Sequence, residues 1–554
     1  MKQPLLQLDQ LRIAFGEREV VHGLSLEVFP GERLGIVGES GSGKSVSALS
    51  IMGLLPADGQ VSHGSINLAT GEGGSEPIQD FSSRQFQKIR GRRIGMIFQE
   101  PMHTLNPVIR CGTQITEAIR QDPGIGKLEA KDKTYHWMER VGLSDLDRMY
   151  RSFPHQLSGG QKQRLMIAMA LCRDPELLIA DEPTTALDLH IQRQIIDLIL
   201  ALSEDLGLSV LFISHDLGVV RKITHRVVVM EKGHAVETGT TESLFDAPQH
   251  PYTKGLLACR PPLDKRLYRL PTIRDFVEGG EVKTREQQVK PAGEESPVLS
   301  MRGVSVHFQS GGSWFRKARR EIRAVDDVSG NVFRGQTLGL VGESGSGKTT
   351  LGRTIVGLQA PTTGSITFDG IPLAGSDRRD SFLRKRIQMI FQDPYSALNP
   401  RMTVGKAITE PLKWHFPDWT QSQYQDRMVE LLEQVGMEAD HQYRFPQAFS
   451  GGQRQRICIA RALAPEPDLL VCDESVSALD VSVQAQVLNL LKELQETYQL
   501  TYVFISHDMS VIRFMADHIM VLKEGVVQEA GPADQVFSQP GSVYTRSLLD
   551  SVLF

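Results

Sequence analysis

Short, almost uninterrupted runs of apolar residues recur along the chain, and each run in the first half has a counterpart in the second. The runs lie at residues 34–37, 177–180 and 211–213, and at residues 338–341, 469–472 and 502–505. Such runs are typical of strands that are buried on both faces of a parallel sheet. Residues 191–206 and 481–498 carry apolar residues at helical spacing. This alternation predicts an α/β fold with a mostly parallel sheet, present twice.

A glycine-rich loop follows the first apolar run of each half. The two loops consist of Gly38, Glu39, Ser40, Gly41, Ser42, Gly43, Lys44 and Ser45, and of Gly342, Glu343, Ser344, Gly345, Ser346, Gly347, Lys348 and Thr349. Between a strand and a helix, such glycines let backbone N–H groups wrap a phosphate at the positive end of the helix. We expect Lys44 and Lys348 to reach the outer phosphates, and Ser45 and Thr349 to offer a hydroxyl to Mg²⁺. The sequence therefore predicts two nucleotide sites.

An Asp-Glu pair ends a later apolar run in each half. Asp181 and Asp473 are candidates for holding Mg²⁺, directly or through its water shell, and Glu182 and Glu474 for the general base that activates the attacking water. Acidic pairs at strand ends are often only surface or capping residues. Their position relative to the phosphate loops favours the functional interpretation.

Two further residue types recur at matching strand ends. His215 and His507 stand in identical Ile-Ser-His-Asp contexts, where a histidine is able to contact the γ-phosphate and steady the water. A single histidine would more often be structural, but its recurrence favours function. Gln99 and Gln392 begin turn-prone segments in which an amide oxygen is able to reach Mg²⁺.

A third repeated segment precedes a helix-compatible run in each half. Its residues are Ser158, Gly159, Gly160 and Gln161 in the first half and Ser450, Gly451, Gly452 and Gln453 in the second. A serine hydroxyl and glycine N–H groups at a helix start form an anion site. Together with the phosphate loops and the acidic pairs, this segment makes the chain resemble the ATP-binding cassette (ABC) family. The resemblance covers nearly all of both halves.

The resemblance implies two tandem P-loop NTPase domains, each with a mostly parallel sheet core and an inserted helical subdomain. In that family the signature segment of one domain closes over the nucleotide held by the other. The implied composite sites are Lys44, Gln99, Asp181, Glu182 and His215 with Ser450 and Gly452, and Lys348, Gln392, Asp473, Glu474 and His507 with Ser158 and Gly160. Asp188 and Asp480 match the family's loop that couples the sites.

The family also stacks an aromatic residue on adenine, and Phe15 lies at the matching distance before the first loop. Phe308 is the candidate in the second half, where an insert at residues 311–320 shifts the spacing. We interpret this insert as a solvated loop, with contact to lipid headgroups or a partner as the alternative. The second half also has Ser475 where the family has a proline such as Pro183. Its glutamate is kept, so we expect both sites to be active and reject a scaffold with dead sites.

With 554 residues the chain is too long for one core. The repeat places domain one at residues 1–262 and domain two at 297–554. Residues 263–296 are mostly polar and are expected to form a solvated linker. A Gly-rich surplus at residues 70–77 indicates a surface loop insertion in the first copy.

Composition excludes several classes of function. The net charge of −5 argues against a dominant electrostatic grip on nucleic acid. The five cysteines show no metal-ligand spacing, which favours reduced thiols in a cytosolic setting. Some relatives in the family carry a cysteine cluster for iron–sulfur binding near the end of the domain, but only Cys259 lies there in this chain, so the resemblance implies no such cluster. No signal peptide or apolar run of about 18 residues is present, so we expect no membrane-spanning segment.

Two sequence details indicate which members of the ABC family the chain resembles most. A Leu-Asn-Pro follows each glutamine, at residues 105–107 and 398–400, and His250-Pro251-Tyr252-Thr253 ends domain one. These resemble the ATPases of bacterial dipeptide, oligopeptide and nickel importers, and the fused layout is most similar to that of microcin C-type peptide importers. Domain two keeps only Tyr544-Thr545 and Leu548-Leu549 of this ending.

The resemblance implies a peripheral subunit on the cytoplasmic face of the bacterial inner membrane. Its partners would be two integral membrane permease subunits and an extracytoplasmic solute-binding protein. A peptide is the expected cargo, with nickel chelates and glutathione-like thiols as alternatives. The rival hypothesis is a soluble tandem ABC ATPase that acts on ribosomes or nucleic acid. The short linker of mixed charge and the importer-type ending argue against that rival.

Overall fold

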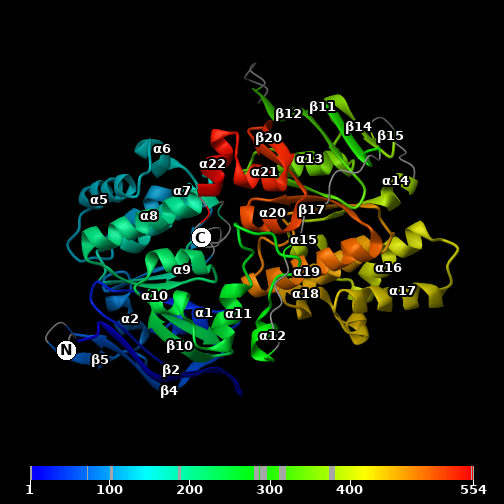
Figure 1. The fold of residues 1–554 in the computed structure, drawn as a ribbon. Coiled ribbons are helices and arrows are strands. Elements are labelled where there is room, and N and C mark those ends of the chain that lie inside the picture. Colours follow the sequence, from blue (N-terminus) through cyan, green and yellow to red (C-terminus); the bar gives the residue numbers. More distant parts are fainter. Residues whose placement is uncertain are drawn as a thin grey trace. The chain divides into compact units, whose positions relative to one another are not determined.

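The computed structural model describes residues 3–70, 73–99, 104–184, 187, 189–279, 286, 296–310, 320–373, 381–550 and 552. The chain forms two compact units (Figure 1). Unit 1 contains Met1–Leu257 and Ile273–Gly280, and unit 2 contains Ala258–Thr272 and Glu281–Val552. The segment between the repeats is thus shared between the units.

The main sheet of unit 1 has six strands, and five of them run parallel to their neighbours. In spatial order they are β10 (His234–Thr240), β9 (Arg226–Glu231), β3 (Arg33–Val37), β8 (Ser209–Ile213), β7 (Leu177–Asp181) and β6 (Ile94–Ile97), with β10 antiparallel to β9 at the edge. The central strands are buried on both faces, as their apolar runs predict. Because they are parallel, the loops after β3, β6, β7 and β8 emerge at one edge of the sheet. The predicted α/β fold is confirmed.

Unit 1 also contains a second sheet, which is antiparallel. The sequence did not predict this sheet. Its strands, in order, are β2 (Arg18–Val28), β1 (Leu6–Phe15), β4 (Gly59–Ala69) and β5 (Ser75–Pro77). Buried and exposed residues alternate along β1 with irregularities, so no continuous apolar run marks it. The segment expected to be a surface loop insertion therefore contributes a short edge strand, β5. Residues 71 and 72 of that segment lie outside the described residues.

The helices of unit 1 cover the main sheet, and those between β6 and β7 form the inserted helical subdomain. They are α1 (Lys44–Ile51), α2 (Ser83–Ile89), α4 (Cys111–Ile119), α5 (Lys127–Arg140), α6 (Leu146–Arg151), η1 (Pro154–Gln156), α7 (Gly159–Leu171), α8 (Leu189–Leu206), α9 (Leu217–Ile223), α10 (Thr241–Asp246), α11 (Pro251–Ala258) and α12 (Ile273–Val277). One apolar core joins the inserted helices to one face of the main sheet, and a second fills the space between the two sheets.

Unit 2 repeats the same two sheets. The main sheet has the order β16 (Ile387–Ile390), β17 (Leu469–Asp473), β18 (Thr501–Ser506), β13 (Thr337–Val341), β19 (His518–Lys523) and β20 (Val526–Pro532). The antiparallel sheet has the order β12 (Arg320–Val332), β11 (Leu299–Ser310), β14 (Thr363–Phe368) and β15 (Ile371–Pro372). The insert after Phe308 lies almost entirely outside the described residues, which resume at Arg320.

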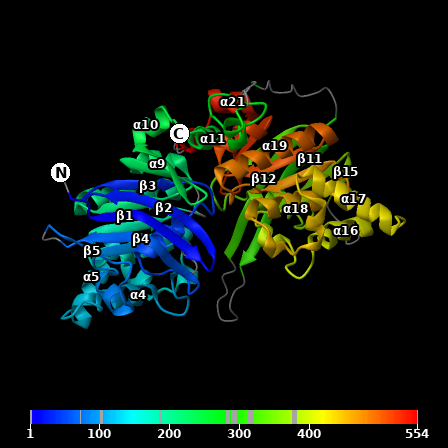
Figure 2. The ribbon, with the colours of Figure 1, turned by 90° about the horizontal axis from the view of Figure 1, so that it is seen from below.

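The helices of unit 2 also repeat those of unit 1. They are α13 (Lys348–Ile355), α14 (Ser381–Arg386), α15 (Pro394–Ala397), α16 (Val404–His415), α17 (Gln421–Gln434), η2 (Ala439–Tyr443), η3 (Pro446–Ala448), α18 (Gly451–Leu463), α19 (Val481–Tyr498), α20 (Met509–Met515), α21 (Ala533–Ser538) and α22 (Val543–Asp550). Helices α16, α17 and α18 pack together as the inserted helical subdomain (Figure 2). Both predicted repeats thus have the same architecture.

The expectation that residues 263–296 form a solvated linker is wrong for its first part. Arg266, Leu267 and Leu270 are buried in unit 2. The backbone N–H of Leu270 donates to Asn489 Oδ1 (2.8 Å), and Asn489 Nδ2 donates back to the Leu270 carbonyl (2.9 Å). Tyr268 donates its hydroxyl to Glu496 (2.7 Å). Polar residues of α19 therefore bind this segment, which its composition did not reveal.

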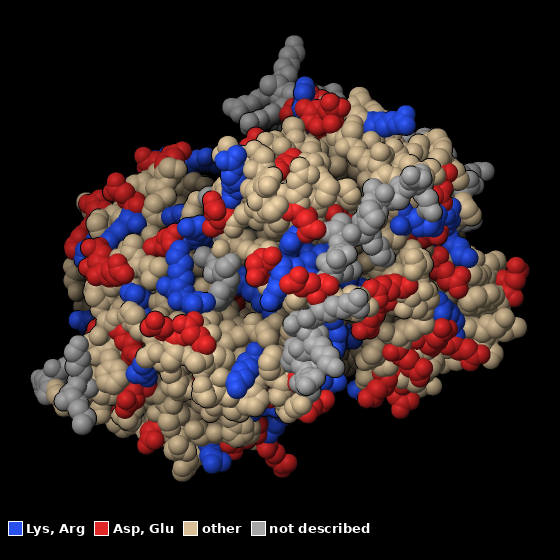
Figure 3. Space-filling model, in the orientation of Figure 1, with Lys and Arg blue, Asp and Glu red and all other residues tan. Residues whose placement is uncertain are grey.

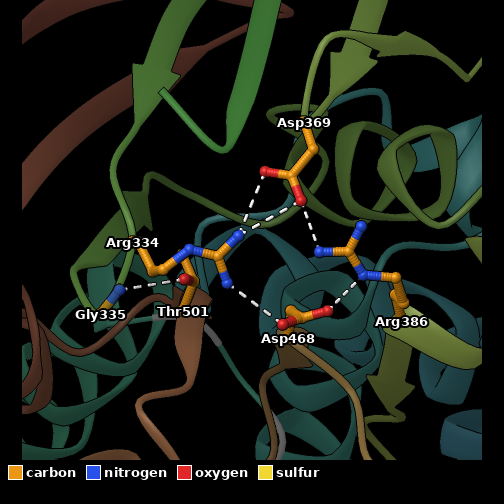
Figure 4. Close-up of polar contacts among 6 residues, drawn as sticks. All are labelled: Arg334, Gly335, Asp369, Arg386, Asp468 and Thr501. Atoms are coloured by element: carbon orange, nitrogen blue, oxygen red, sulfur yellow. Dashed lines mark hydrogen bonds and ion pairs between the residues drawn. The ribbon is translucent and has the colours of Figure 1, made fainter. Parts of the chain in front are cut away.

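A group of four charged side chains joins several loops of unit 2 (Figure 4). Arg334 contacts Asp369 (3.2 Å) and Asp468 (3.1 Å), and Arg386 is paired with the same two carboxylates. Each arginine therefore bridges the turn after β14 and the residue before β17.

The surface and the thiols agree with the composition. On the face drawn in Figure 3, Lys and Arg side chains are interspersed with Asp and Glu side chains. All five cysteines are buried, as expected of small core residues.

Candidate functional site

The first phosphate loop joins β3 to α1 in unit 1. Gly38 has φ 154°, and a Cβ there would lie 2.1 Å from the backbone oxygen of Met230, so only glycine fits. Lys44 Nζ donates to the carbonyl oxygens of Gly38 (2.8 Å) and Glu39 (2.7 Å). The lysine therefore folds back over the start of its own loop, within reach of the place where phosphates are expected.

The second loop has the same geometry between β13 and α13. A Cβ on Gly342 would lie 2.1 Å from the backbone oxygen of Leu522. Lys348 Nζ donates to the carbonyls of Gly342 (2.7 Å) and Glu343 (2.8 Å). The two loops thus agree in conformation as well as in sequence.

A hydroxyl and a carboxylate meet beside each loop. Ser45 Oγ donates to Asp181 Oδ1 (3.0 Å), and Thr349 Oγ1 donates to Asp473 Oδ1 (2.9 Å). Burial raises the pKa of Asp181 to about 6, against the opposing effect of the Ser45 hydrogen bond. Burial raises the pKa of Asp473 in the same way. Hard oxygen ligands of this kind suit Mg²⁺, and a divalent cation would favour the ionised form that burial disfavours.

The glutamate of unit 1 lies between the predicted glutamine and histidine. Gln99 Nε2 donates to Glu182 Oε2 (3.1 Å), and His215 Nδ1 lies 3.1 Å from Glu182 Oε1. Because the amide nitrogen of Gln99 holds the glutamate, the amide oxygen expected to reach Mg²⁺ is the other branch of the same group. The structure therefore brings together residues that follow β6, β7 and β8.

Unit 2 repeats this arrangement. Gln392 Nε2 donates to Glu474 Oε2 (2.7 Å), and His507 Nδ1 lies 3.5 Å from Glu474 Oε1. Burial alone would raise the pKa of Glu474, but the contact with His507 outweighs it and the pKa is lowered. Burial alone would lower the pKa of His507, but Glu474 outweighs it and the pKa is raised. The pair thus stabilises an ionised glutamate.

The signature segments form the first turns of α7 and α18. Ser158 Oγ accepts from Gln161 N (3.3 Å) while Ser158 N donates to Gln161 Oε1 (3.1 Å), which is a capping box. Ser450 and Gln453 form the same pair with the same distances. Each serine and its two glycines therefore lie at a helix start, as predicted.

The candidates for adenine stacking and for coupling between the sites belong to separate elements of the fold. Phe15 ends β1, and its ring packs against Gly59. Phe308 lies in β11 and is 40% exposed. Asp480 is the N-cap residue of α19, whereas Asp188 lies outside the described residues. Their roles in binding and coupling stay predictions.

Two tyrosines whose only sequence signal was the family resemblance contact the phosphate loops. Tyr252 Oη accepts from Glu39 N (3.1 Å), and Tyr544 Oη accepts from Glu343 N (3.1 Å). The available signal was the repeated Tyr-Thr at the end of both domains.

Comparison with known proteins agrees with this doubled geometry. The ABC transporter family profile matches residues 21–185 and 325–477, which is more than half of the chain. The chain belongs to the ABC transporter family. A profile described as the oligopeptide/dipeptide transporter C-terminal region matches residues 236–284, which include Tyr252.

Individual relatives cover nearly the whole chain. It is 44% identical to the glutathione import ATP-binding protein GsiA of Salmonella paratyphi A, over 99% of this chain and 89% of the relative. The GsiA protein of Escherichia coli (strain K12) gives the same identity and coverage. Among solved structures, the ATP-binding cassette MJ0796 bound to ADP and Pi is 30% identical over 42% of this chain and 98% of its own length, with a TM-score of 0.38.

As a member of this family with two tandem ABC domains, the chain is an ATP-binding transporter ATPase. The finer resemblance to microcin C-type importers stays a prediction. Among the described residues, no helix combines the length and apolarity that crossing a membrane requires.

Proposed function

We propose that this ABC ATPase binds and hydrolyses ATP at two composite sites to power the uptake of glutathione or short peptides. The observation that carries the proposal is the duplicated constellation in which a phosphate loop, a hydroxyl–aspartate pair and a glutamate held by glutamine and histidine meet at one sheet edge. An importer-type ending follows the first of them.

Each site has a residue for each requirement of phosphoryl transfer. Lys44 neutralises phosphate charge, and Ser45 with Asp181 would hold Mg²⁺, which when bound offsets charge on the phosphate oxygens. Glu182 accepts a proton from the attacking water, and His215 keeps that carboxylate in place. Lys348, Thr349, Asp473, Glu474 and His507 have the same roles in the second site.

The composite arrangement assigns the signature of unit 2 to the first loop and that of unit 1 to the second. Supporting it, both signatures are preformed helix starts, where an N-terminal helix end favours a phosphate. A Lys348→Ala chain leaves only the first loop functional. In this chain Ser450→Asp should abolish ATP hydrolysis through charge repulsion, whereas Ser158→Asp should preserve it. The reverse pattern, or equal loss in both, would contradict the assignment.

The transport role requires membrane partners. Next to Gln392, unit 2 presents Tyr395 (65% exposed), and Tyr443 (71%) and Phe445 (49%) add exposed aromatic surface on its helical subdomain. We infer that two permease subunits dock at such surfaces on the cytoplasmic face of the bacterial inner membrane. An extracytoplasmic binding protein would deliver the cargo. The GsiA relatives favour glutathione as that cargo.

Purification of the full chain from its native membrane tests the transport role. Recovery with two integral membrane proteins, and ATPase activity that rises when glutathione-loaded binding protein is added to the reconstituted complex, are expected. Stimulation by dipeptide alone would keep the importer and change the cargo. Recovery with ribosomes or nucleic acid, and no membrane protein, would overturn the proposal.

A further inference from the structure

The importer-type ending of each repeat folds back onto its own phosphate loop. The hydroxyl of Tyr252, in α11, accepts a hydrogen bond from the backbone N–H of Glu39 at 3.1 Å. Tyr252 is fully buried, so its hydroxyl is held in place by packing. In sequence the two residues are 213 positions apart. The contact therefore depends on docking of the whole ending.

A carboxylate fixes the start of the ending on the main sheet. Glu237 in β10 accepts hydrogen bonds from the backbone N–H groups of Gln249 (2.8 Å) and His250 (3.1 Å). His250 Nδ1 then accepts from the N–H of Tyr252 (3.2 Å). These hydrogen bonds form a continuous path from β10 to Tyr252.

Unit 2 builds the same chain of contacts with partly different residues. Glu529 in β20 accepts from the N–H groups of Gly541 (2.8 Å) and Ser542 (3.0 Å), and Ser542 Oγ accepts from Tyr544 N (3.2 Å). Tyr544 Oη accepts from Glu343 N at 3.1 Å. Serine thus replaces histidine without loss of the tyrosine contact. Both endings share the carboxylate, the tyrosine, and the threonine and leucine pair that follow it.

The tyrosine and the lysine hold the same residue of the loop from two sides. Tyr252 binds the N–H of Glu39, and Lys44 binds its carbonyl. Lys44 has to share its three donors with the phosphates once nucleotide is present. Because the Glu39 N–H already donates to Tyr252, it is not among the N–H groups that the loop offers to the phosphates. This hydrogen bond would therefore hold the first turn of the loop when Lys44 turns toward a bound nucleotide.

We propose that Tyr252 and Tyr544 are positioning residues that hold each phosphate loop in its nucleotide-binding conformation and so make ATP affinity depend on the docked importer-type ending. This rests on the proposed assignment of both loops as ATP sites. Loss of one such hydrogen bond corresponds to about a fivefold change in affinity. Neither tyrosine is expected to touch the reacting atoms, so ATP binding should weaken while the maximal rate persists.

The test uses the full chain with one loop disabled and a fluorescent ATP analogue as the probe. In the Lys348→Ala chain, Tyr252→Phe should raise the Kd about fivefold and Tyr544→Phe should leave it within about twofold. In the Lys44→Ala chain the two tyrosine variants should exchange their effects. In steady-state assays each variant should raise KM for ATP with little change in kcat.

Tyr502→Phe is the matched control. It removes a buried hydroxyl whose partner is the Leu491 carbonyl (2.8 Å), away from both loops, and should leave both Kd values unchanged. Unchanged affinity of the loop next to the altered tyrosine, or equal weakening of both loops, would overturn the proposal. If the Lys44→Ala, Lys348→Ala double variant still binds the probe as tightly as the parent, the assignment of the ATP sites fails instead.

Discussion

Arg266 and Asp517 form an ion pair of 3.0 Å inside unit 2, with only 3% and 7% of their side chains exposed. Arg266 comes from the segment between the repeats and also donates to the carbonyl of Met515, at the end of α20 (3.3 Å). The other oxygen of Asp517 accepts from Thr337 N at the start of β13 (2.9 Å). Arg266 therefore connects the end of α20 with the strand that leads into the second phosphate loop.

In unit 1 a different arginine binds the carbonyl that corresponds to that of Met515. Ile223 ends α9 as Met515 ends α20, and its carbonyl accepts from Arg33 Nε at 2.8 Å. Arg33 belongs to the unit's own strand β3, where unit 2 has Thr337. Threonine is too short to reach that carbonyl. The segment between the repeats thus gives unit 2 a guanidinium that unit 1 carries itself.

Replacing Arg266 by Gln should destabilise unit 2 by about 3–5 kcal/mol, because Asp517 would be left buried without its ion-pair partner. Hydrogen exchange should accelerate in α20 and β19 but not in the corresponding α9 and β9. Arg323→Gln, which removes an exposed ion pair with Asp326, is the control and should have little effect. Equal exchange in the two units would count against this role for Arg266.

Unit 2 should also be stable with an arginine at position 337, which corresponds to Arg33 of unit 1. In unit 1 Arg33 Nη1 also lies 3.4 Å from Ser203 Oγ, whereas in unit 2 Gln495 fills that place and bonds to Thr337. We expect Thr337→Arg with Gln495→Ser to restore stability to an Arg266→Ala chain. Thermal unfolding of the parent, of the Arg266→Ala chain and of the chain with all three substitutions measures the recovery of stability. No recovery would show that an arginine at position 337 cannot replace Arg266.

The raised pKa of Asp181 predicts that nucleotide binding depends on pH. Its pKa of about 6 in the folded protein lies above the ordinary value of 3.8, so the folded state binds more protons and loses stability as pH rises from about 4 to 6. Mg²⁺ requires the ionised carboxylate. Magnesium-dependent ATP binding at the first loop should therefore weaken as pH falls below about 6, measured in the Lys348→Ala chain.

The same reasoning predicts opposite effects of Asp181→Asn with and without nucleotide. Asparagine can still accept from Ser45 and carries no charge to bury, so the nucleotide-free protein should gain up to about 3 kcal/mol at neutral pH. The added stability from Mg²⁺ and ATP should be lost. Asp197→Asn, at an exposed carboxylate paired with Lys222, is the control. A loss of stability in the nucleotide-free Asp181→Asn protein would refute this account.

The four charged residues in Figure 4 should contribute unequally to stability. Arg386 is 18% exposed and Arg334 is 43% exposed, although both contact Asp369 and Asp468. Arg386→Gln should cost about 1 kcal/mol and Arg334→Gln less than about 0.5, because exposed ion pairs are screened. Urea unfolding at low salt and at about 1 M salt measures both, and the costs should shrink at high salt. A larger loss for Arg334→Gln would contradict this order.

Much of the site could be predicted because parallel strands bring distant residues to one edge. Asp181 and Ser45 are far apart in sequence, but Asp181 ends β7 and Ser45 comes after the loop that follows β3, at the same end of the sheet. The contact of Tyr252 could not be predicted, because it depends on where a terminal helix folds back. The burial of Arg266 could not be predicted for a related reason: a charged residue in a polar segment is expected to be solvated until its buried partner is known. The antiparallel sheets lacked the continuous apolar runs that revealed the parallel ones.

Replacing Glu182 and Glu474 by Gln should suppress ATP hydrolysis by about 10²–10⁴ while preserving ATP binding, because glutamine cannot accept the proton from the attacking water. Glutamine can still accept from Gln99 or Gln392 through its amide oxygen, so the local contacts should largely survive. Turnover and nucleotide binding are measured on the full chain with one or both substitutions. The backbone of Glu182 (φ 47°) and Glu474 (φ 44°) is left-handed in both units, and the side-chain change leaves it intact. Asp197→Asn, at an exposed carboxylate paired with Lys222, controls for the loss of one negative charge. Undiminished turnover in the double variant would remove both glutamates from the role of general base.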